Sequence, residues 1–534
     1  MVLHGPLERT SCDFCQLNYY DSRRSHLCGA YVQNSPGTRA RAVRVSALTA
    51  VTLSLLTSVL IPRAAARPSE PPPPTDEQIA AQLRDEAIAG EDLAWDWVSE
   101  LTTRFGPRPA GSDGEHQAAE WAASRLKALG FANVHIESFP ITAWVRGAES
   151  AQIVTPAPQP LVVAALGESP PTPAGGLEGE VVIFPTFADL KEAPPGSLAG
   201  RIAFVAARMV RTQDGAGYAA AVEARGDGPA EAAKRGAIAF VLRSVGTDSN
   251  RLAHTGTTRY VEGRVPLPAF ALAAPDADQI ERLAALGEKV RIRLYSSASY
   301  VPNAHSQNVI ADVPGRLHPE EVVLLGAHLD SWDQGTGAID DGAGTAIITA
   351  AAQLILNLPH HVPRRTVRLV LFGSEEVAQP AAPFGAFGGH AYADVHKAEL
   401  TRHVLAGESD FGTDRAYALA LPALVAKSQF ASSVFRVLQP IGVMAAREPP
   451  RDAGTDVGPT VEAGVPGFAL LQDGSRYFDI HHTPDDTLDK IDREQLDQNV
   501  AAWAAVVWLA ADSAVDFSGM NRKITPETLG APAQ

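Results

Sequence analysis

The chain has 534 residues, of which 45% are hydrophobic and 20% are charged, and its formal net charge is -16 at neutral pH. This composition is typical of a globular protein with two or three domains and excludes a disordered chain. The acidic balance argues against general nucleic-acid binding, which needs a basic surface, and gives no support for adhesion to anionic membranes.

The first 66 residues have the pattern of an export signal. A basic stretch precedes the apolar run Val45–Ile61, and small residues follow up to Ala66, where we expect cleavage. More than forty residues precede the apolar run, so we expect the true start to lie downstream. The alternative is an uncleaved membrane anchor. With cleavage, the protein is exported to the periplasm or secreted and has no stable membrane partner.

All three cysteines, Cys12, Cys15 and Cys28, precede the expected cleavage site. A single C-x-x-C pair without a second one is only a weak signal for metal or redox chemistry. We therefore expect a mature chain that has no disulfide and whose stability comes from its core.

Changes in composition divide the chain into successive regions. Asp76 to Arg104 is rich in helix formers, Ser112 and Glu115 form a capping-box pattern for a second helical stretch, and Gly130 ends it. The predicted regions are a signal region (1–66), a Pro-rich linker (67–75), the N-terminal part of the main domain (76–150), an insert (151–300), the catalytic domain (301–515) and a tail (516–534).

The sequence pattern of the predicted insert differs from that of the regions around it. Short strand-like pieces such as "GEVVIF", "GRIAFVAA" and "GAIAFVL" alternate with glycine and proline turns, and a helical "GPAEAAKR" precedes the last of them. No cluster of histidines and acids occurs here. We predict a separate, β-rich module without chemistry of its own.

From Asn308 onward, strand-like and helix-like segments alternate. The strands are "EVVLLGAHLD", "TVRLVLFGSEE", "HVLAGESD" and "GFALLQDG", and helices such as "GAGTAIITAAAQLILNL" separate them. This pattern predicts an α/β fold with a mostly parallel central sheet flanked by helices. Histidines and acids follow the strands, at the edge where open α/β sheets bind ligands.

Four clusters carry the candidate chemistry. They are His328 and Asp330 with Asp340 and Asp341; Glu375 with Glu376; Glu408 with Asp410; and His481 with His482. Each cluster alone has an ordinary structural explanation, but separate structural causes would not place all four at strand ends. Imidazoles and carboxylates without a thiolate suit catalytic Zn²⁺. The H-E-x-x-H, G-x-S-x-G and P-loop motifs are absent from the sequence.

The strings "GAHLDSWDQGTGAIDDGAG", "FGSEE", "ESD" and "HHTPDDT" resemble the M28 family of zinc peptidases, in particular its carboxypeptidase Q (plasma glutamate carboxypeptidase) branch. The resemblance covers roughly Asp76 to Ser513 and includes the insert, which looks like a protease-associated domain. It implies the zinc exopeptidase fold.

The resemblance also implies two zinc ions per chain. The implied ligands are His328 and Asp410 on one ion, Glu376 and His482 on the other, and Asp340 bridging both. His482 matches the family pattern rather than His481, because it is the histidine followed by T-P-D-D-T. The peptide bond after the bridging aspartate is implied to be cis.

The family pattern assigns two further roles. Glu375 is implied as the general base and acid, and Asp330 as the carboxylate that orients the ring of His328. The segment after Glu376, "VAQPAAPFGAFGGHAYA", is longer than the family's usual turn, so Asp414 stays a substitute for Asp410. We expect loops such as Phe384–Gly389 and Gly474–Phe478 to build the side-chain specificity site.

The expected activity is that of an exopeptidase on a peptide or dipeptide substrate. One alternative is a single-zinc acyltransferase of the glutaminyl cyclase type, and another is a non-catalytic binding protein like the transferrin-receptor relatives. The complete five-ligand set argues against both alternatives, and a count of metal per chain separates the single-zinc acyltransferase from the di-zinc exopeptidase. The preference for aminopeptidase, dipeptidase or carboxypeptidase substrates stays open, as does the oligomeric state, with a homodimer as one option.

Overall fold

The computed structural model describes residues 73–90, 92–259 and 267–520. The expected signal region, the three cysteines and most of the proline-rich linker lie outside the described residues, so export and the absence of disulfides stay predictions. Most of the predicted tail also lies outside. Phe517, at the start of that tail, is buried and its ring packs edge-on against Phe430.

Three helices open the described chain: α1 (Asp76–Ile88), α2 (Asp92–Phe105) and α3 (Asp113–Leu129). Gly130 ends α3 in the left-handed conformation, as predicted. Ser112 accepts a hydrogen bond from the N–H of Glu115, but the capping box is only half formed. The buried Glu115 carboxylate instead accepts hydrogen bonds from the N–H of Gly111 and the hydroxyl of Ser306, which ties the start of α3 to the central sheet.

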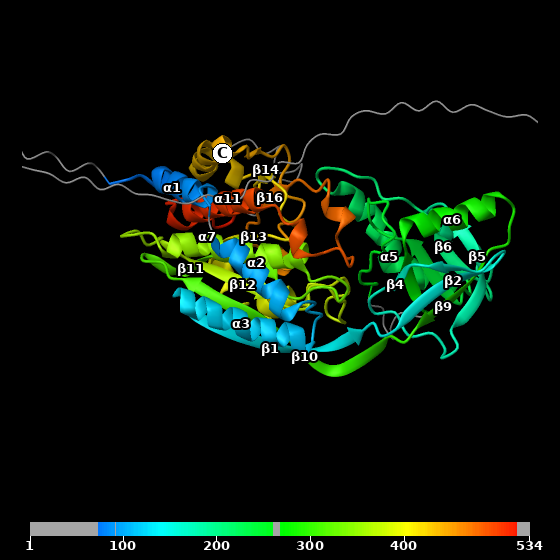
Figure 1. Cartoon of the computed structure of the whole chain (residues 1–534). Coiled ribbons are helices and arrows are strands. Elements are labelled where there is room, and N and C mark those ends of the chain that lie inside the picture. Colours follow the sequence, from blue (N-terminus) through cyan, green and yellow to red (C-terminus); the bar gives the residue numbers. More distant parts are fainter. Residues whose placement is uncertain (1–72, 91, 260–266, 521–534) are drawn as a thin grey trace, which may run out of the picture. The chain divides into compact units, whose positions relative to one another are not determined.

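Within the described residues, the central sheet has five strands in the order β1-β10-β12-β11-β13. They are β1 (Ala132–Val145), β10 (Ser299–Val313), β12 (Arg365–Phe372), β11 (His318–His328) and β13 (His403–Glu408). β11 pairs in parallel with β12 and β13, whereas β10 pairs antiparallel with β1 and β12. The sheet is therefore mixed and not mostly parallel. The difference arises because the chain leaves for the insert along β1 and returns along β10 (Figure 1).

The predicted strand "GFALLQDG" does not form a regular strand of the central sheet. Its residues form β16 (Ala469–Gln472), which pairs with β14 (Ala416–Ala420) in a smaller sheet that also contains β15 (Met444–Ala445). An isolated parallel bridge between Ala406 and Gly467 links this segment to β13.

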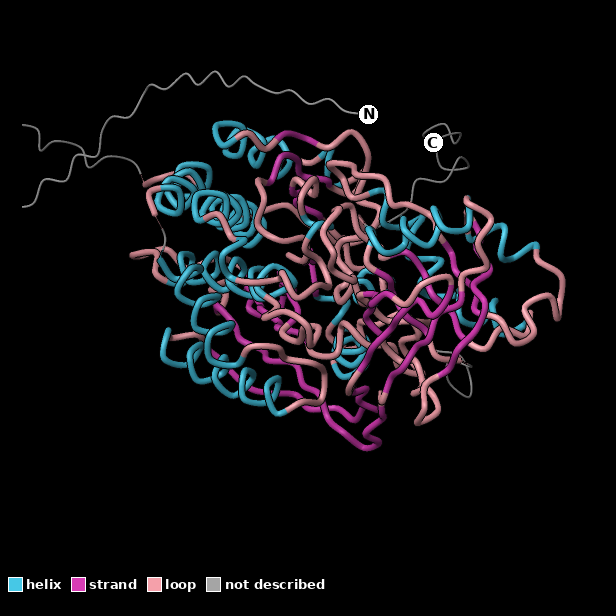
Figure 2. The backbone as a smooth tube through the Cα atoms, turned by 45° about the vertical axis from the view of Figure 1, so that its right-hand side comes forward, coloured by secondary structure: helices cyan, strands magenta, loops and turns pink. Residues whose placement is uncertain are grey.

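β12 and the second half of β11 are buried on both faces of the central sheet. Alternate residues of a strand point to opposite sides, so each strand contributes to two cores. Along β11, Val323 and Leu325 belong to one apolar core, and Val322 and Leu324 belong to another. The first core also draws on α1–α3, α7 (Ala343–Leu356), α9 (Gln429–Leu438) and α11 (Arg493–Asp512), and the second on α8 (Phe387–Val395) and α10 (Gly458–Glu462). Helices thus flank the strands on both sides (Figure 2).

Among the described helices, one stretch, Ala338–Leu356, is long and apolar enough to cross a membrane. The fold buries 89% of this stretch. It includes α7, whose residues pack in the first core against β11 and α11. Its apolar character is therefore explained by its place inside the protein.

The described part of the insert contains a sheet in the order β3-β2-β9-β5-β6-β7-β8-β4. Its strands are β2 (Glu149–Thr155), β3 (Gln159–Leu161), β4 (Val163–Ala165), β5 (Leu177–Phe184), β6 (Ile202–Val205), β7 (Ala239–Arg243), β8 (Ala269–Leu272) and β9 (Arg291–Ser296). The helices α4 (Phe187–Glu192), α5 (Ala216–Lys234) and α6 (Ala274–Ala285) accompany it. The insert is therefore richer in helix than predicted.

One apolar core is shared between the insert and the part of the chain that forms the central sheet and its loops. It contains Trp144 near the end of β1 and Phe204 of β6, together with Trp332 and Val377 from loops that follow β11 and β12. The insert therefore packs against the loops at the carboxyl edge of the central sheet.

Candidate metal centre and active site

Three strand ends bring the predicted site residues to one edge of the central sheet. His328 is the last residue of β11, Glu375 and Glu376 follow β12, and Asp410 follows β13. Because β11 runs parallel to both neighbours, the three carboxyl ends lie at the same edge. Asp340 comes from the turn that leads into α7.

The carboxylate of Asp340 lies between two histidines. Its Oδ1 is 3.1 Å from Nε2 of His328, and its Oδ2 is 3.2 Å from Nε2 of His482. The same nitrogen of His328 is 3.3 Å from Oδ1 of Asp410, and the same nitrogen of His482 is 3.1 Å from Oε2 of Glu376. The five expected ligands thus form two groups that share Asp340.

Three oxygens of these ligands lack the hydrogen bonds that buried carboxylates normally make. Oδ2 of Asp340, Oε1 of Glu376 and Oδ1 of Asp410 are buried without a hydrogen-bond partner. The first and third of them nevertheless lie close to histidine nitrogens. Unpaired carboxylate oxygens beside imidazole nitrogens, with no thiolate, are a donor set that fits Zn²⁺.

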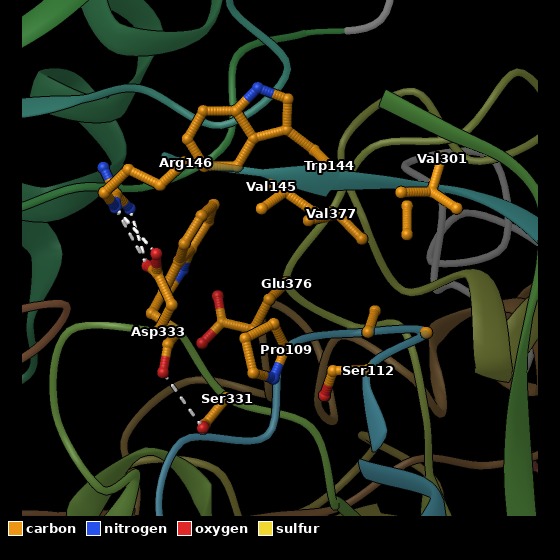
Figure 3. Close-up of a pocket in the computed structure, with 14 residues that line it drawn as sticks. Pro109, Ser112, Trp144, Val145, Arg146, Val301, Ser331, Asp333, Glu376 and Val377 are labelled. Atoms are coloured by element: carbon orange, nitrogen blue, oxygen red, sulfur yellow. Dashed lines mark hydrogen bonds and ion pairs between the residues drawn. The ribbon is translucent and has the colours of Figure 1, made fainter. Parts of the chain in front are cut away.

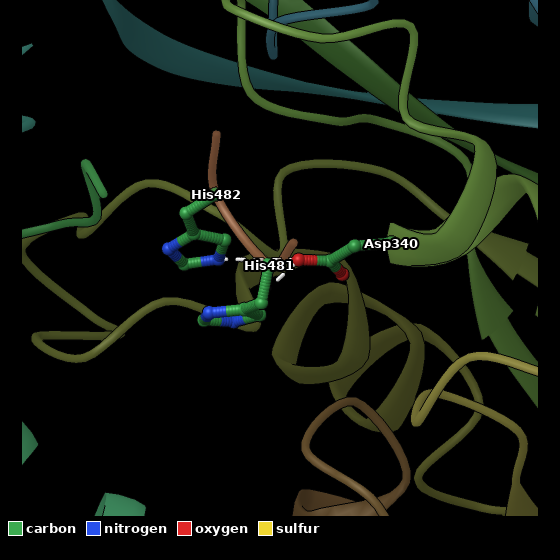
Figure 4. A group of neighbouring side chains, drawn as sticks. All are labelled: Asp340, His481 and His482. Atoms are coloured by element: carbon green, nitrogen blue, oxygen red, sulfur yellow. Dashed lines mark ion pairs between the residues drawn. The ribbon is translucent and has the colours of Figure 1, made fainter. Parts of the chain in front are cut away.

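Donor atoms within 4.8 Å of one another form further overlapping groups in this region. They are Asp340 with His481 and His482, His328 with Glu375 and Glu376, and His328 with Asp341 and Asp410. Figure 4 shows the first group. The whole region is therefore dense in side chains that can hold a metal.

His481 and His482 occupy different surroundings although they are adjacent. Their rings stack with centroids 3.5 Å apart, and Nε2 of His481 is 3.6 Å from Oδ2 of Asp340 (Figure 4). The other ring neighbours of His481 are Tyr218, Tyr477 and Phe478. His482, in contrast, contacts two of the predicted ligands, so the geometry favours it over His481 as a ligand.

Asp330 contacts His328 in a way that differs from the prediction. Nδ1 of His328 is 2.9 Å from the main-chain carbonyl of Asp330, whereas the carboxylate oxygen is 3.7 Å away. The carboxylate instead accepts hydrogen bonds from the N–H groups of Glu375 at 3.0 Å and Glu376 at 3.3 Å. Asp330 therefore ties the end of β11 to the loop after β12.

The peptide bond between Asp340 and Asp341 is cis, which confirms the expectation from the family resemblance. The Asp341 carboxylate is buried and accepts hydrogen bonds from the N–H groups of His328 and Gly344, both at 3.0 Å. It therefore joins the end of β11 to the start of α7. Burial, together with the charge of Asp410, raises the pKa of Asp341 well above its usual range.

Asp486 holds the turn that carries Asp340, a role that sequence reasoning missed. Its Oδ1 accepts hydrogen bonds from the N–H groups of Ala338 at 2.9 Å and Ile339 at 2.6 Å, and its Oδ2 accepts one from Asp340 at 3.3 Å. Burial, together with the charge of Asp340, raises the pKa of Asp486 to about 7. The sequence signal that could have indicated this role is the position of Asp486 in the "HHTPDDT" string of the family.

Arg108 is a second residue that the sequence reasoning missed. It is fully buried and donates hydrogen bonds to the carbonyls of Leu329 at 2.7 Å, Thr336 at 2.7 Å and Gly337 at 2.9 Å. Burial lowers its pKa to about 10. Arg108 therefore fixes the loop between His328 and the turn that carries Asp340. The glycine- and proline-rich sequence around it, "GPRPAGS", gives no local sign of this role.

The insert, for which we predicted no chemistry, reaches this site through Thr255. Its N–H donates to the carbonyl of His482 at 3.0 Å, and its own carbonyl is 3.3 Å from Nδ1 of His482. The adjacent His254 has Nδ1 at 2.8 Å from the carbonyl of His481 and Nε2 at 2.7 Å from Asp248. A metal-binding histidine commonly donates its other ring N–H to such an oxygen, so the insert orients His482.

Glu375 is half-buried in the loop after β12, next to the predicted ligand Glu376. Burial raises the pKa of the Glu375 carboxyl well above its usual range, and the charges of Glu376 and Asp410 act in the same direction. A raised pKa suits a group that accepts and returns a proton near neutral pH. The surroundings therefore fit the predicted role of Glu375 as a base.

Asp414, the substitute considered for Asp410, lies in a different environment. Its carboxylate accepts hydrogen bonds from the guanidinium of Arg476. Asp410, in contrast, contacts His328 at 3.3 Å. The geometry therefore favours Asp410 over Asp414.

Residues 308–507 match the model of peptidase family M28. Carboxypeptidase Q from Mus musculus is 34% identical over 438 residues, which cover 82% of this chain and 90% of that protein. The chain belongs to peptidase family M28. Carboxypeptidase Q from Homo sapiens is also 34% identical, over 81% of this chain and 89% of that protein.

Solved structures agree with this assignment. A peptidase M28 precursor from Shewanella amazonensis is 45% identical and has a TM-score of 0.79, covering 83% of this chain and 98% of that chain. A zinc aminopeptidase from Bacillus subtilis is 21% identical with a TM-score of 0.57, covering 82% and 98%, and shows the shared fold alone. This M28 peptidase thus has a mixed α/β fold, and by family it is a hydrolase and a metalloprotease.

The long segment after Glu376 is anchored in this M28 peptidase by side-chain hydrogen bonds. The side chain of Gln379 donates to the carbonyl of Thr142 and accepts from its N–H, both at 3.0 Å. The N–H of Ala378 donates to the hydroxyl of Thr257 in the insert at 3.2 Å. The segment is therefore held between β1 and the insert.

Proposed function

We propose that this M28 peptidase is a di-zinc exopeptidase that releases N-terminal residues from peptides or splits dipeptides. His328 and Asp410 hold one zinc ion, Glu376 and His482 hold the other, and Asp340 bridges the two. The observation that carries the proposal is that the two oxygens of Asp340 face Nε2 atoms of two different histidines, at 3.1 and 3.2 Å.

The charges of the site support two ions. The ligand carboxylates of Asp340, Glu376 and Asp410 oppose two dications, which leaves a small formal positive charge before water binds. Without cations, so many buried carboxylates would repel one another strongly. Two divalent ions therefore account for the crowding of acids at this edge of the sheet.

The residues of the site have different roles in the proposed reaction. When bound, zinc polarises a peptide carbonyl and lowers the pKa of water to about 7. Glu375 takes the proton from the attacking water on its carboxylate and later passes it to the leaving amine. Asp330 holds the N–H groups of both Glu375 and Glu376, so base and ligand keep a fixed relative position.

A substrate panel with a metal count tests this proposal. The panel contains aminoacyl-nitroanilides, dipeptides and N-blocked peptides, each with and without phenanthroline, and zinc is counted per chain. We expect hydrolysis of substrates with a free amino group, loss of activity with the chelator, and two zinc ions. Hydrolysis of blocked peptides alone contradicts the assignment. One zinc ion per chain would favour the acyltransferase alternative, and no metal with no turnover would favour a binding protein.

Substitutions separate the base from the ligands. Glu375→Gln is expected to keep both zinc ions and to lose turnover by about 10²–10⁴-fold. Asp340→Ala is expected to lose zinc and turnover together. Glu448→Gln, at an exposed position of the same domain, is the matched control and is expected to change neither. Wild-type turnover in Glu375→Gln would refute the role given to this residue.

We also propose that the insert is a protease-associated domain and that the chain is exported. The support for the first proposal is the family resemblance and the insert's place between β1 and β10. The support for the second is the signal-like pattern of residues 1–66. N-terminal sequencing of protein from the culture medium or periplasm is expected to begin at Arg67. An intact N-terminus in the membrane fraction would indicate the anchor.

A further inference from the structure

A mostly apolar cavity of about 180 Å³ lies against the candidate metal centre. Its lining includes Glu376 and Val377 from the loop after β12 (Figure 3). Trp332 from the loop after β11 also lines it. The end of β1 contributes Trp144 and Val145. The cavity therefore joins the edge that carries the site to the strand that leads into the insert.

Small residues keep this cavity open. Ala110, Gly111 and Ala143 line it, and a side chain at Gly111 would meet Cβ of Ala143 at 3.0 Å. Gly111 also has a φ of 77°, a conformation that favours glycine. Larger residues at these positions would fill the cavity or displace β1.

The charges in the cavity wall are already paired. Two nitrogens of Arg146 lie 2.8 Å from the two carboxylate oxygens of Asp333 (Figure 3). Other N–H groups of Arg146 donate to the hydroxyl of Thr255 at 3.0 Å and to the carbonyl of Ala165. Among the described lining residues, Glu376 is the remaining charge, and it contacts His482. A charged substrate side chain would therefore be desolvated here without a free partner.

The cavity borders the predicted ligand Glu376, and this position determines which part of a substrate can reach it. Glu376 is in its wall, and the ring centroid of Trp332 is 5.6 Å from that of His482. With the scissile carbonyl at the metal centre, the residues that flank this bond are the ones within reach. An engineered apolar cavity of about 150 Å³ admits benzene, so this space accommodates a side chain the size of leucine or phenylalanine.

We propose that this cavity binds an apolar side chain, aliphatic or aromatic, of a substrate residue next to the scissile bond. The inference rests on the proposed peptidase function and adds the substrate class. It differs from our sequence-based expectation, because the loops Phe384–Gly389 and Gly474–Phe478 do not contribute to the described lining. The specificity of this site comes instead from β1 and from the loops that meet the insert.

Two dipeptide series, X-Ala and Ala-X, test this inference with X as Gly, Ala, Leu, Phe, Glu or Lys. In one series, the zinc-loaded wild-type enzyme is expected to prefer Leu or Phe over Ala by about tenfold or more in kcat/KM. The same series is expected to disfavour Glu and Lys. The series that shows the preference identifies which residue beside the scissile bond enters the cavity.

Two substitutions narrow the cavity at separate places. Ala110→Leu fills its interior, and Val301→Trp blocks its rim, where Val301 is 46% exposed and a larger side chain is compatible with folding. Both variants are expected to lose the preference for Leu and Phe over Ala and to keep two bound zinc ions. Ala199→Leu, at an exposed position of the insert, is the control and is expected to keep the preference.

The outcomes separate this inference from the function beneath it. Equal rates for every X in both series, or a proportional loss for every X in both cavity variants with zinc retained, would overturn the cavity assignment and leave the peptidase intact. Failure of the zinc-loaded wild type to cleave any dipeptide or aminoacyl-nitroanilide would overturn the proposed function and, with it, the substrate class.

Discussion

Replacing Asp486 by alanine is expected to disturb Asp340 without removing any predicted ligand. One oxygen of Asp486 accepts hydrogen bonds from Ala338 and Ile339 at 2.9 and 2.6 Å, and all three residues are buried. A buried N–H left without a partner costs about 1–3 kcal/mol. Loss of these two short bonds is therefore expected to lower the free energy of unfolding by about 2–6 kcal/mol.

Asparagine at position 486 separates the hydrogen bonds from the charge. Its carbonyl oxygen can replace Oδ1 and keep both short bonds, so the longer contact to the N–H of Asp340, at 3.3 Å, is the one affected. We expect Asp486→Asn to cost about 1 kcal/mol and to keep both zinc ions. Asp485→Ala is the matched control, because this neighbouring side chain is 43% exposed and pairs with Lys490 at the surface.

Urea unfolding and a zinc count per chain measure both effects. The expected order of stability places Asp485→Ala beside wild type, Asp486→Asn slightly below, and Asp486→Ala well below with reduced zinc. If Asp486→Ala unfolds at the wild-type urea concentration and keeps two zinc ions, the turn does not depend on these hydrogen bonds. Equal damage in both Asp486 variants would assign the role to the carboxylate charge.

Asp410→Ala is expected to lose one zinc ion per chain, whereas Asp414→Ala is expected to keep both. Elemental analysis after dialysis measures this, and the reverse result would mean that Asp414 is the ligand. His254→Ala is expected to weaken the binding of one zinc ion by about tenfold in a chelator titration, because the substitution loosens the segment that orients His482. Unchanged binding would show that the insert has no role in holding His482. Burial lowers the pKa of His403 to about 4. The pKa of a histidine in the unfolded chain is near 6.5, so the free energy of unfolding is expected to fall by up to about 3 kcal/mol between pH 6.5 and pH 4. In His403→Gln, the free energy of unfolding is expected to change less over this range.

Local signals were sufficient to predict the elements that end at the site. The apolar run before His328 is buried on both faces as β11, and Gly130 ends α3 where a left-handed residue is needed. The family strings then pointed to Asp340, whose cis bond to the next residue was expected. Such features depend on residues close together in the sequence, or on family motifs whose three-dimensional arrangement is already known.

Features that depend on distant contacts escaped prediction. Asp486 bonds to N–H groups 146–148 positions earlier in the chain, and no local pattern reports such a partner. Glu115 has the spacing of a capping box, yet Ser306 of β10 captures its carboxylate. The direction of β10 likewise follows from the return of the chain after the insert and not from its own alternation.

The contact between Thr255 and His482 has a consequence for any attempt to reduce this enzyme to a minimal form. Splicing β1 directly to β10 would excise the partner of the imidazole Nδ1 and of the main-chain carbonyl at His482. The apolar wall around Trp144 and Trp332 would face water as well. The insert is thus part of the structure that holds His482 and covers the apolar residues beside the site.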